Sequence, residues 1–120
     1  MIRSLQLALG VGRIAFGIGL MTVPRPMAGL LMGTAAEQTG ARFAARSYGT
    51  RDLILGGGLV YAALGGSDVR PWLAAGIAAD AMDAGLQLLE WDELVPGRRA
   101  AGVTAASTVT AAGIALLSRS

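Results

Sequence analysis

The sequence predicts an all-α fold, a four-helix transmembrane bundle, and three observations lead to this prediction. Of the 120 residues, 53% are hydrophobic and 15% are charged, whereas soluble domains contain about 25% charged residues. Four long apolar stretches follow one another, and each approaches the roughly 20 residues that a helix needs to cross a hydrocarbon core. Eighteen glycines favour close contact between helices in lipid. We therefore expect a multi-pass integral protein of the cell membrane.

The first half of the chain contains two predicted spans and a shorter apolar segment between them. The first span covers about residues 4–23 and ends at Pro24-Arg25-Pro26, because proline does not continue a helix. The second span covers about residues 41–64 and ends at a glycine pair. The segment 27–36 is apolar but too short to cross. We expect it to be an interfacial or re-entrant segment.

The second half of the chain contains the other two predicted spans. The third span covers about residues 71–91 and begins at Pro71, because proline is favourable in the first turn of a helix. The fourth span covers about residues 100–117. The sequence contains no extramembrane domain or linker, so residues 1–120 are expected to form a single membrane domain.

The residue types that are absent from the sequence exclude several kinds of chemistry. There is no Cys, His or Lys, and all ten basic residues are Arg. Disulfides, ordinary zinc sites and Schiff bases to lysine are therefore excluded, and proton transfer must use carboxylates. The net charge is only +2 and no basic run exceeds Arg98-Arg99, which argues against nucleic-acid binding. We expect neither a metal nor a cofactor.

The most informative residues are charged groups in the middle of the predicted spans. An ionised side chain at the centre of a membrane helix costs about 2.5 to 3.5 kcal/mol. Such residues must therefore face one another or a polar cavity. Five residues belong to this group: Arg13, Arg51, Asp52, Asp80 and Asp83.

Helical spacing supports a polar interior. Residues three or four positions apart lie on the same face of a helix. One such stripe in the third span contains Asp80, Asp83, Gln87 and Glu90. A comparable stripe of polar and small residues in the first span contains Gln6, Gly10, Arg13 and Gly17. We expect these two stripes to face each other across the bundle.

Charge counting indicates that the interior holds a proton. The two central arginines carry +2 and the three central aspartates carry −3, which leaves one negative charge in excess. Asp80 and Asp83, one turn apart, are expected to share a proton because repulsion and desolvation oppose a second charge. Alternatively, Arg46 cancels the excess and the group is a neutral structural network. If the site binds a substrate, Arg46, Gln87 and Glu90 are the expected contacts.

The order of short motifs also resembles a known group of proteins. The motifs are Gly12-Arg13, Pro24-Arg25-Pro26, Arg-Ser-Tyr-Gly-Thr-Arg-Asp from Arg46 to Asp52, and Asp80-Ala-Met-Asp83. In this layout the chain resembles small uncharacterised four-span membrane proteins of high-GC actinobacteria. The resemblance covers most of the chain and implies a four-span membrane protein, but it implies no reaction.

Three functions are compatible with these residues. The first is a cofactor-independent acid/base enzyme that opens an epoxide, cyclises or isomerises a small lipophilic substrate. In this hypothesis Asp80 or Asp83 donates a proton, and Arg13, Arg51 and Asp52 complete the catalytic set. The second is a proton-coupled transporter or ion pathway. The third is a structural or assembly subunit whose buried ion pairs fix the helix register.

Small residues also predict association between copies of the chain. Ala8, Gly12, Ala15 and Gly19 share one face of the first span, and Gly102, Ala106 and Thr110 share a face of the fourth. Small residues at these intervals allow helices to approach closely in lipid. We expect a homo-oligomer that contacts its partner through one of these spans.

Overall fold

The computed structural model describes the backbone of residues 1–120 and every side chain except that of Leu31. The described backbone forms helices and contains no strand, so the predicted all-α class is confirmed. The α-helices are α1 (Ile2–Thr22), α2 (Pro24–Met32), α3 (Ala41–Tyr61), α4 (Arg70–Leu89) and α5 (Arg99–Ser118). Short 3₁₀ segments span Gly33–Glu37 and Trp91–Glu93, and a π-helical turn spans Ala62–Gly66. The four long helices begin and end within a few residues of the predicted spans.

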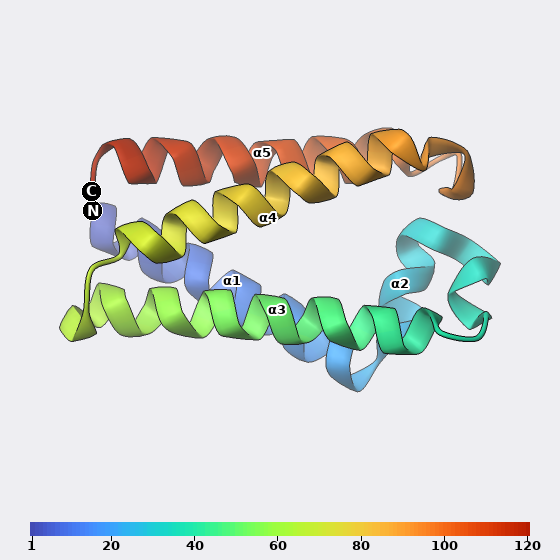
Figure 1. Ribbon diagram of the computed structural model, residues 1–120, viewed down its shortest axis with the longest axis horizontal. Helices are drawn as coiled ribbons and strands as arrows, with labels where there is room; N and C mark the ends of the chain where they lie inside the picture. Colours follow the sequence, from blue (N-terminus) through green and yellow to red (C-terminus); the bar gives the residue numbers. More distant parts are fainter.

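The four long helices are arranged as two antiparallel pairs (Figure 1). Helix α1 packs along α3, and α4 packs along α5, whereas contact between the two pairs is much less extensive. The resulting bundle measures 42 × 25 × 18 Å. Both termini lie at one end of the bundle, and α2 lies near the other end (Figure 1).

Glycine contacts hold α1 and α3 close together. A Cβ atom on Gly56 would lie 2.5 Å from the carbonyl oxygen of Gly10, and one on Gly17 would lie 2.7 Å from that of Gly49. No side chain fits at such distances, so glycine allows the two backbones to touch. The buried face of α1 is the predicted stripe of Gln6, Gly10, Arg13 and Gly17, extended by Leu20.

The end of the bundle near the termini is closed by apolar packing. Leu59, Leu73 and Leu116 form a buried cluster that joins α3, α4 and α5. The side-chain amide of Gln6 donates a hydrogen bond to the Ser120 hydroxyl at 3.0 Å, which ties the two ends of the chain together. This end therefore holds the two helix pairs together.

The segment between α1 and α3 forms a short helix. Helix α1 ends at Thr22, and Pro24 then occupies the first turn of α2, where its missing N–H needs no partner. The proline motif therefore ends one helix, as predicted, and also begins the next. The predicted segment 27–36 consists of residues 27–32 of α2 and most of the 3₁₀ segment Gly33–Glu37. Its position at a membrane interface stays a prediction.

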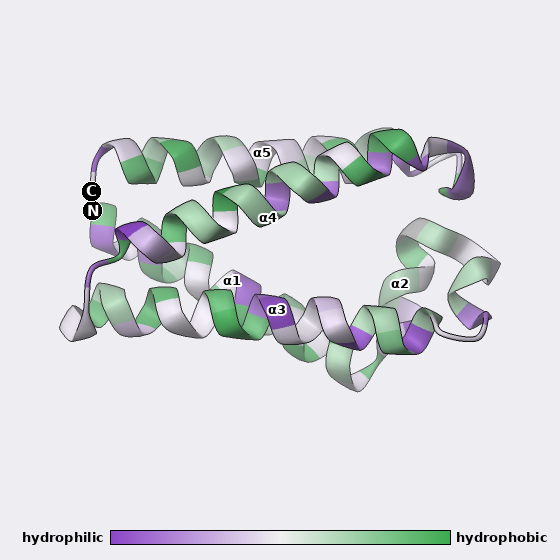
Figure 2. Cartoon of the chain, in the orientation of Figure 1, coloured by the Kyte–Doolittle hydropathy of each residue, from purple (hydrophilic) through white to green (hydrophobic). Residues whose placement is uncertain are grey.

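Charged side chains are buried in the middle of the bundle, and many large apolar side chains are exposed on its surface. Arg13, Asp52 and Asp80 are buried, as is Gln6. Large apolar side chains on the long helices are exposed, including Phe16, Ile18, Phe43, Ile54, Met82, Leu88 and Ile114. Figure 2 shows hydrophilic segments in the middle of α3 and α4 as well as at the helix ends. The helices are therefore apolar on the outside and charged inside.

Two of the helices, α1 and α5, are long and apolar enough to cross a membrane. Helices α3 and α4 have similar lengths, 21 and 20 residues, but their central charged residues make them less apolar. The prediction of four membrane-crossing helices is thus supported for two of them by length and composition.

Candidate active site

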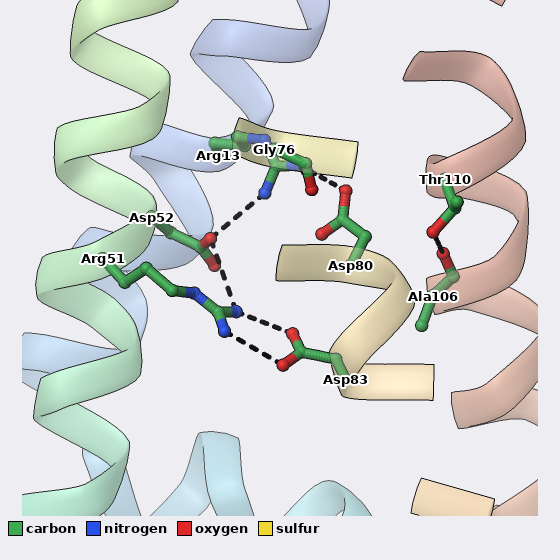
Figure 3. Close-up of polar contacts among 8 residues, drawn as sticks. All are labelled: Arg13, Arg51, Asp52, Gly76, Asp80, Asp83, Ala106 and Thr110. Carbon is green, nitrogen blue, oxygen red and sulfur yellow. Dashed lines mark hydrogen bonds and ion pairs between the residues drawn. The ribbon is translucent and has the colours of Figure 1, made fainter. Parts of the chain in front are cut away.

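The five central charged residues form one continuous network halfway along the bundle (Figure 3). Its members alternate in charge from one end to the other, in the order Asp80, Arg13, Asp52, Arg51 and Asp83. Helix α1 supplies one member, α3 supplies two and α4 supplies two. The structure therefore brings together the whole predicted catalytic set.

Arg13 is the centre of the buried half of this network. Its Nη1 donates to Asp52 Oδ1 at 3.2 Å, and its Nη2 donates to Asp80 Oδ2. The same Nη2 lies 3.4 Å from the carbonyl oxygen of Gly76. A Cβ atom on Gly76 would lie 3.0 Å from Nη2, so glycine leaves room for the guanidinium. The side chains of Arg13, Asp52 and Asp80 are only 9%, 6% and 10% exposed.

Arg51 and Asp83 form the more accessible half of the network. The guanidinium donates two parallel hydrogen bonds to the carboxylate, at 2.9 and 2.6 Å, a geometry that fixes both planes. Arg51 Nη2 also lies 3.8 Å from Asp52 Oδ1, which links the two halves. The side chains of Arg51 and Asp83 are 31% and 20% exposed. This pair is therefore the more accessible part of the network.

Tyr48 is a site residue that the sequence prediction missed. Its ring centroid lies 4.7 Å from the guanidinium carbon of Arg51, one turn further along α3, within the range of a cation–π contact. The three-residue spacing from Tyr48 to Arg51 on a helix was the available signal. This contact adds to the hydrogen bonds that position the Arg51 guanidinium.

Two cavities meet at the Arg51–Asp83 pair. The first, about 540 Å³, lies among α2, α3 and α4 and includes Tyr48 and Glu90 in its wall. The second, about 680 Å³, lies among α1, α4 and α5 and includes Arg13, Asp52 and Asp80. Both cavities are largely apolar, and both are bordered by Phe16, Met27, Arg51, Asp83 and Gln87. The Arg51–Asp83 ion pair thus forms part of the wall of both apolar cavities.

Helix α5 contributes an apolar wall to the second cavity. The hydroxyl of Thr110 donates to the carbonyl oxygen of Ala106 in the same helix at 2.8 Å (Figure 3). It therefore makes no contact with the five-residue network among the described hydrogen bonds. The polar groups of the site come from α1, α3 and α4.

The two α4 aspartates have separate partners. Each is bound to a different arginine, Asp80 to Arg13 and Asp83 to Arg51, and the proton that they were expected to share stays a prediction. Helices α1 and α3 each contribute one arginine, so each of the two α4 carboxylates has its own cationic partner. The two aspartates are therefore joined through Arg13, Asp52 and Arg51 rather than to each other.

The three predicted substrate contacts have different positions. Gln87 borders both cavities and Glu90 borders the first. Arg46 is exposed, and its Nε donates to the carbonyl oxygen of Met21 at 3.1 Å. It is therefore not brought to the network and does not cancel the excess negative charge. The network is neutral when it holds one proton.

Among the described residues, no group of three or more acidic side chains is arranged to hold a metal ion. Comparisons with protein-family models, with curated proteins and with solved structures found no match.

Proposed function

We propose that this protein is a membrane-embedded, cofactor-independent acid/base enzyme that acts on a small lipophilic substrate. The observation that carries the proposal is the position of the Arg51–Asp83 pair in the wall of both cavities. Cavities of about 300 to 1,000 Å³ with apolar walls and a few polar groups are typical of small-molecule sites. The proposal places one reactive carboxylate and its arginine against an apolar substrate.

The proposal includes a four-span arrangement in the bilayer. Helices α3 and α4, with 21 and 20 residues, are about 30 Å long and match the thickness of the hydrocarbon core. Their central charges are directed toward α1 and toward each other, as the ion pairs with Arg13 and between Arg51 and Asp83 indicate. Their outer faces carry exposed apolar residues such as Ile54 and Met82. These features support insertion of all four long helices.

Exposure divides the network into a reacting part and a positioning part. Asp83, the most exposed of the three aspartates, exchanges protons with the substrate, and Arg51 orients it. Arg13, Asp52 and Asp80 are nearly buried. They hold Arg51 in place through Asp52, and their own charges balance one another through Arg13. In this assignment the five predicted catalytic residues have unequal roles.

This arrangement suits proton transfer without a metal. In epoxide opening, the proton of the network passes to the epoxide oxygen as a C–O bond breaks, and water adds to the carbon. The carboxylate takes a proton from that water, so the network regains the proton that it lost. In an isomerisation, Asp83 removes a proton from one carbon and returns it to another. The arginine stabilises negative charge that develops on an oxygen.

Turnover by the purified protein tests the proposal. The wild-type protein and the Asp83→Asn variant, reconstituted in lipid nanodiscs, are incubated with a panel of lipophilic epoxides and with a bacterial lipid extract. Products are measured by mass spectrometry. The matched control is Glu93→Gln, which changes an exposed carboxylate in the wall of the first cavity. Turnover that is lost in Asp83→Asn and kept in Glu93→Gln supports the proposal, whereas equal turnover in both variants contradicts it.

A structural role is the second candidate, and the buried half of the network favours it. Arg13 has both an aspartate of α3 and an aspartate of α4 as partners, so it fastens three helices to one another. A protein with this role alone shows no turnover with any substrate and no proton flux in proteoliposomes. The measurement of proton flux in these proteoliposomes also tests the transport alternative.

A further inference from the structure

The second cavity is bordered by a charged residue that is not part of the network. This cavity, about 680 Å³, has Arg98 in its wall as well as the five network residues. Arg98 directly precedes α5, at the end of the bundle away from the termini, and is exposed (Figure 1). Its Nη1 donates to the carbonyl oxygen of Leu30 in α2 at 3.0 Å. The described ion pairs do not include Arg98, so its charge is available to an anion.

The packing of α4 against α5 gives the distance between Arg98 and the reacting carboxylate. A Cβ atom on Gly113 would lie 2.8 Å from the side chain of Ile77, so these two residues are level with each other. Because α4 and α5 are antiparallel (Figure 1), Asp83 is level with about residue 107 of α5. A helix rises about 1.5 Å per residue, so Asp83 and Arg98 lie about 14 Å apart along the bundle.

The wall between these two positions is apolar. It consists of small residues of α5 and larger apolar residues of α1 and α2, namely Ala101, Gly102, Ala105, Ala106, Phe16, Met27 and Leu30. Outside the network, Arg98 is the one charged residue among the described residues of this wall. The network itself has more carboxylates than arginines, so an anion is favoured at Arg98 and disfavoured beside Asp83. The cavity therefore matches an apolar chain with an anion at one end.

We propose that the substrate is a single-chain lipophilic anion of the fatty-acid type, whose carboxylate is bound by Arg98 and whose chain extends along α5 to the network. The inference rests on the proposed function, since it names the substrate class of the same site. A guanidinium group matches the hydrogen-bonding geometry of a carboxylate. The group that reacts at Asp83 is then on the part of the chain distant from the carboxylate.

Two photoreactive forms of dodecanoic acid test the orientation of the chain. One carries a diazirine next to the carboxylate and the other carries it at the far end of the chain. The extended acid is about as long as the separation of Arg98 and Asp83. Each form is bound to the protein in phosphatidylcholine nanodiscs, and the labelled residues are located by mass spectrometry. We expect the first form to label residues close to Arg98 and the second to label residues 105–109 of α5. Labelling of the same residues by both forms overturns the inference.

Competition against the photoreactive acid tests the role of the charge. The competitors are dodecanoic acid, dodecanol and methyl dodecanoate, and each affinity is expressed relative to the competitor concentration in the lipid. We expect the acid to bind about fivefold more tightly than the alcohol and the ester. This preference is expected to disappear in Arg98→Gln and to be kept in Arg98→Lys. The matched control is Arg25→Gln, which removes the same charge from an exposed arginine of α2 outside both cavity walls and is expected to keep the preference.

Equal binding of the three competitors by the wild-type protein overturns the inference, and so does an unchanged preference in Arg98→Gln. Phosphatidylglycerol presents the same anionic chemistry as a lipid headgroup. If it displaces the photoreactive acid more strongly than dodecanoic acid does, Arg98 binds a bilayer lipid and the proposed substrate class is wrong. None of these results depends on turnover. Asp83→Asn is expected to bind dodecanoic acid as the wild-type protein does, so its loss of turnover judges the proposed function separately.

Discussion

Arg13 of α1 and Asp52 of α3 form a 3.2 Å ion pair at the place where the two helices touch through glycine. Each charge lies between two glycines of its own helix, at Gly10 and Gly17 in α1 and at Gly49 and Gly56 in α3. The backbones approach closely on both sides of the pair along the helix axis, so no side chain separates the two helices there. A strong cation is thus held in the interior of a thin helical bundle.

Removal of this cation is expected to destabilise the protein strongly. In Arg13→Gln, Asp52 and Asp80 lose their shared partner, and the network is left with one cation and three carboxylates. We expect the free energy of unfolding to fall by about 3 to 5 kcal/mol, the usual result of breaking a buried ion pair. Denaturant unfolding in mild detergent measures it. The control is Arg42→Gln, an exposed arginine at the start of α3, and equal losses in both variants would disprove the central role of Arg13.

The two aspartates of α4 are expected to respond differently to the same substitution. Asp80→Asn changes a buried partner of Arg13 and is expected to lower the free energy of unfolding by about 1 to 3 kcal/mol. Asp83→Asn changes a more exposed group and is expected to cost less than about 1 kcal/mol, but to abolish turnover. Thermal unfolding and product formation are measured on the same samples. A large loss of stability at both positions, with no separable activity, would leave only the structural role.

Two adjacent glycines of α3 provide a matched test of helix packing. A Cβ atom on Gly56 would meet the Gly10 carbonyl oxygen at 2.5 Å, whereas one on Gly57 meets no atom of the described residues within 4 Å. Gly56→Ala is expected to reduce the free energy of unfolding by about 1 to 3 kcal/mol through overpacking. Gly57→Ala is expected to raise it by up to about 1 kcal/mol, since alanine favours the helix. The reverse order would show that α1 and α3 do not touch at Gly56.

The sequence was most informative about helix positions and helix faces. Proline follows the end of α1 and lies in the first turn of α4, and glycine precedes α3. A three-four spacing identified the buried face of α1, because both signals are local. The partners of Asp80 and Asp83 were not predictable, since they depend on the register at which α1 and α3 meet α4. Arg46 was placed in the site for the same reason, although it bonds the Met21 carbonyl. The spacing of residues along one helix predicts which face of that helix a side chain occupies. It does not predict which residues of another helix that face will meet.

The apolar outer surface predicts how the protein behaves in cell fractionation. Exposed apolar side chains such as Phe16 on α1 and Ile114 on α5 require lipid or detergent around them. We expect the protein to stay in the membrane pellet after an alkaline carbonate wash and to be released by dodecyl maltoside. Release by carbonate alone would contradict integral insertion of the four long helices.

Association between copies is expected through the outer face of α1. Ala8, Gly12 and Ala15 lie on the side of α1 away from α3 and are exposed, and small residues at this spacing allow a second helix to approach. Cross-linking in mild detergent is expected to trap a dimer. Ala15→Leu is expected to reduce it, whereas Ala74→Leu on an exposed face of α4 is not. Detection of the monomer alone in native mass measurements would contradict this prediction.

The division of the bundle into two helix pairs also divides the charges of the network between the two halves of the chain. The first pair, α1 with α3, brings Arg13, Arg51 and Asp52 to the network, and the second pair brings Asp80 and Asp83. With ordinary ionisation, the inner face of the first pair carries one positive charge and that of the second carries two negative charges. The first pair leaves the ribosome first during synthesis. The first pair is therefore a cationic partner that is complete before the two carboxylates of α4 are made.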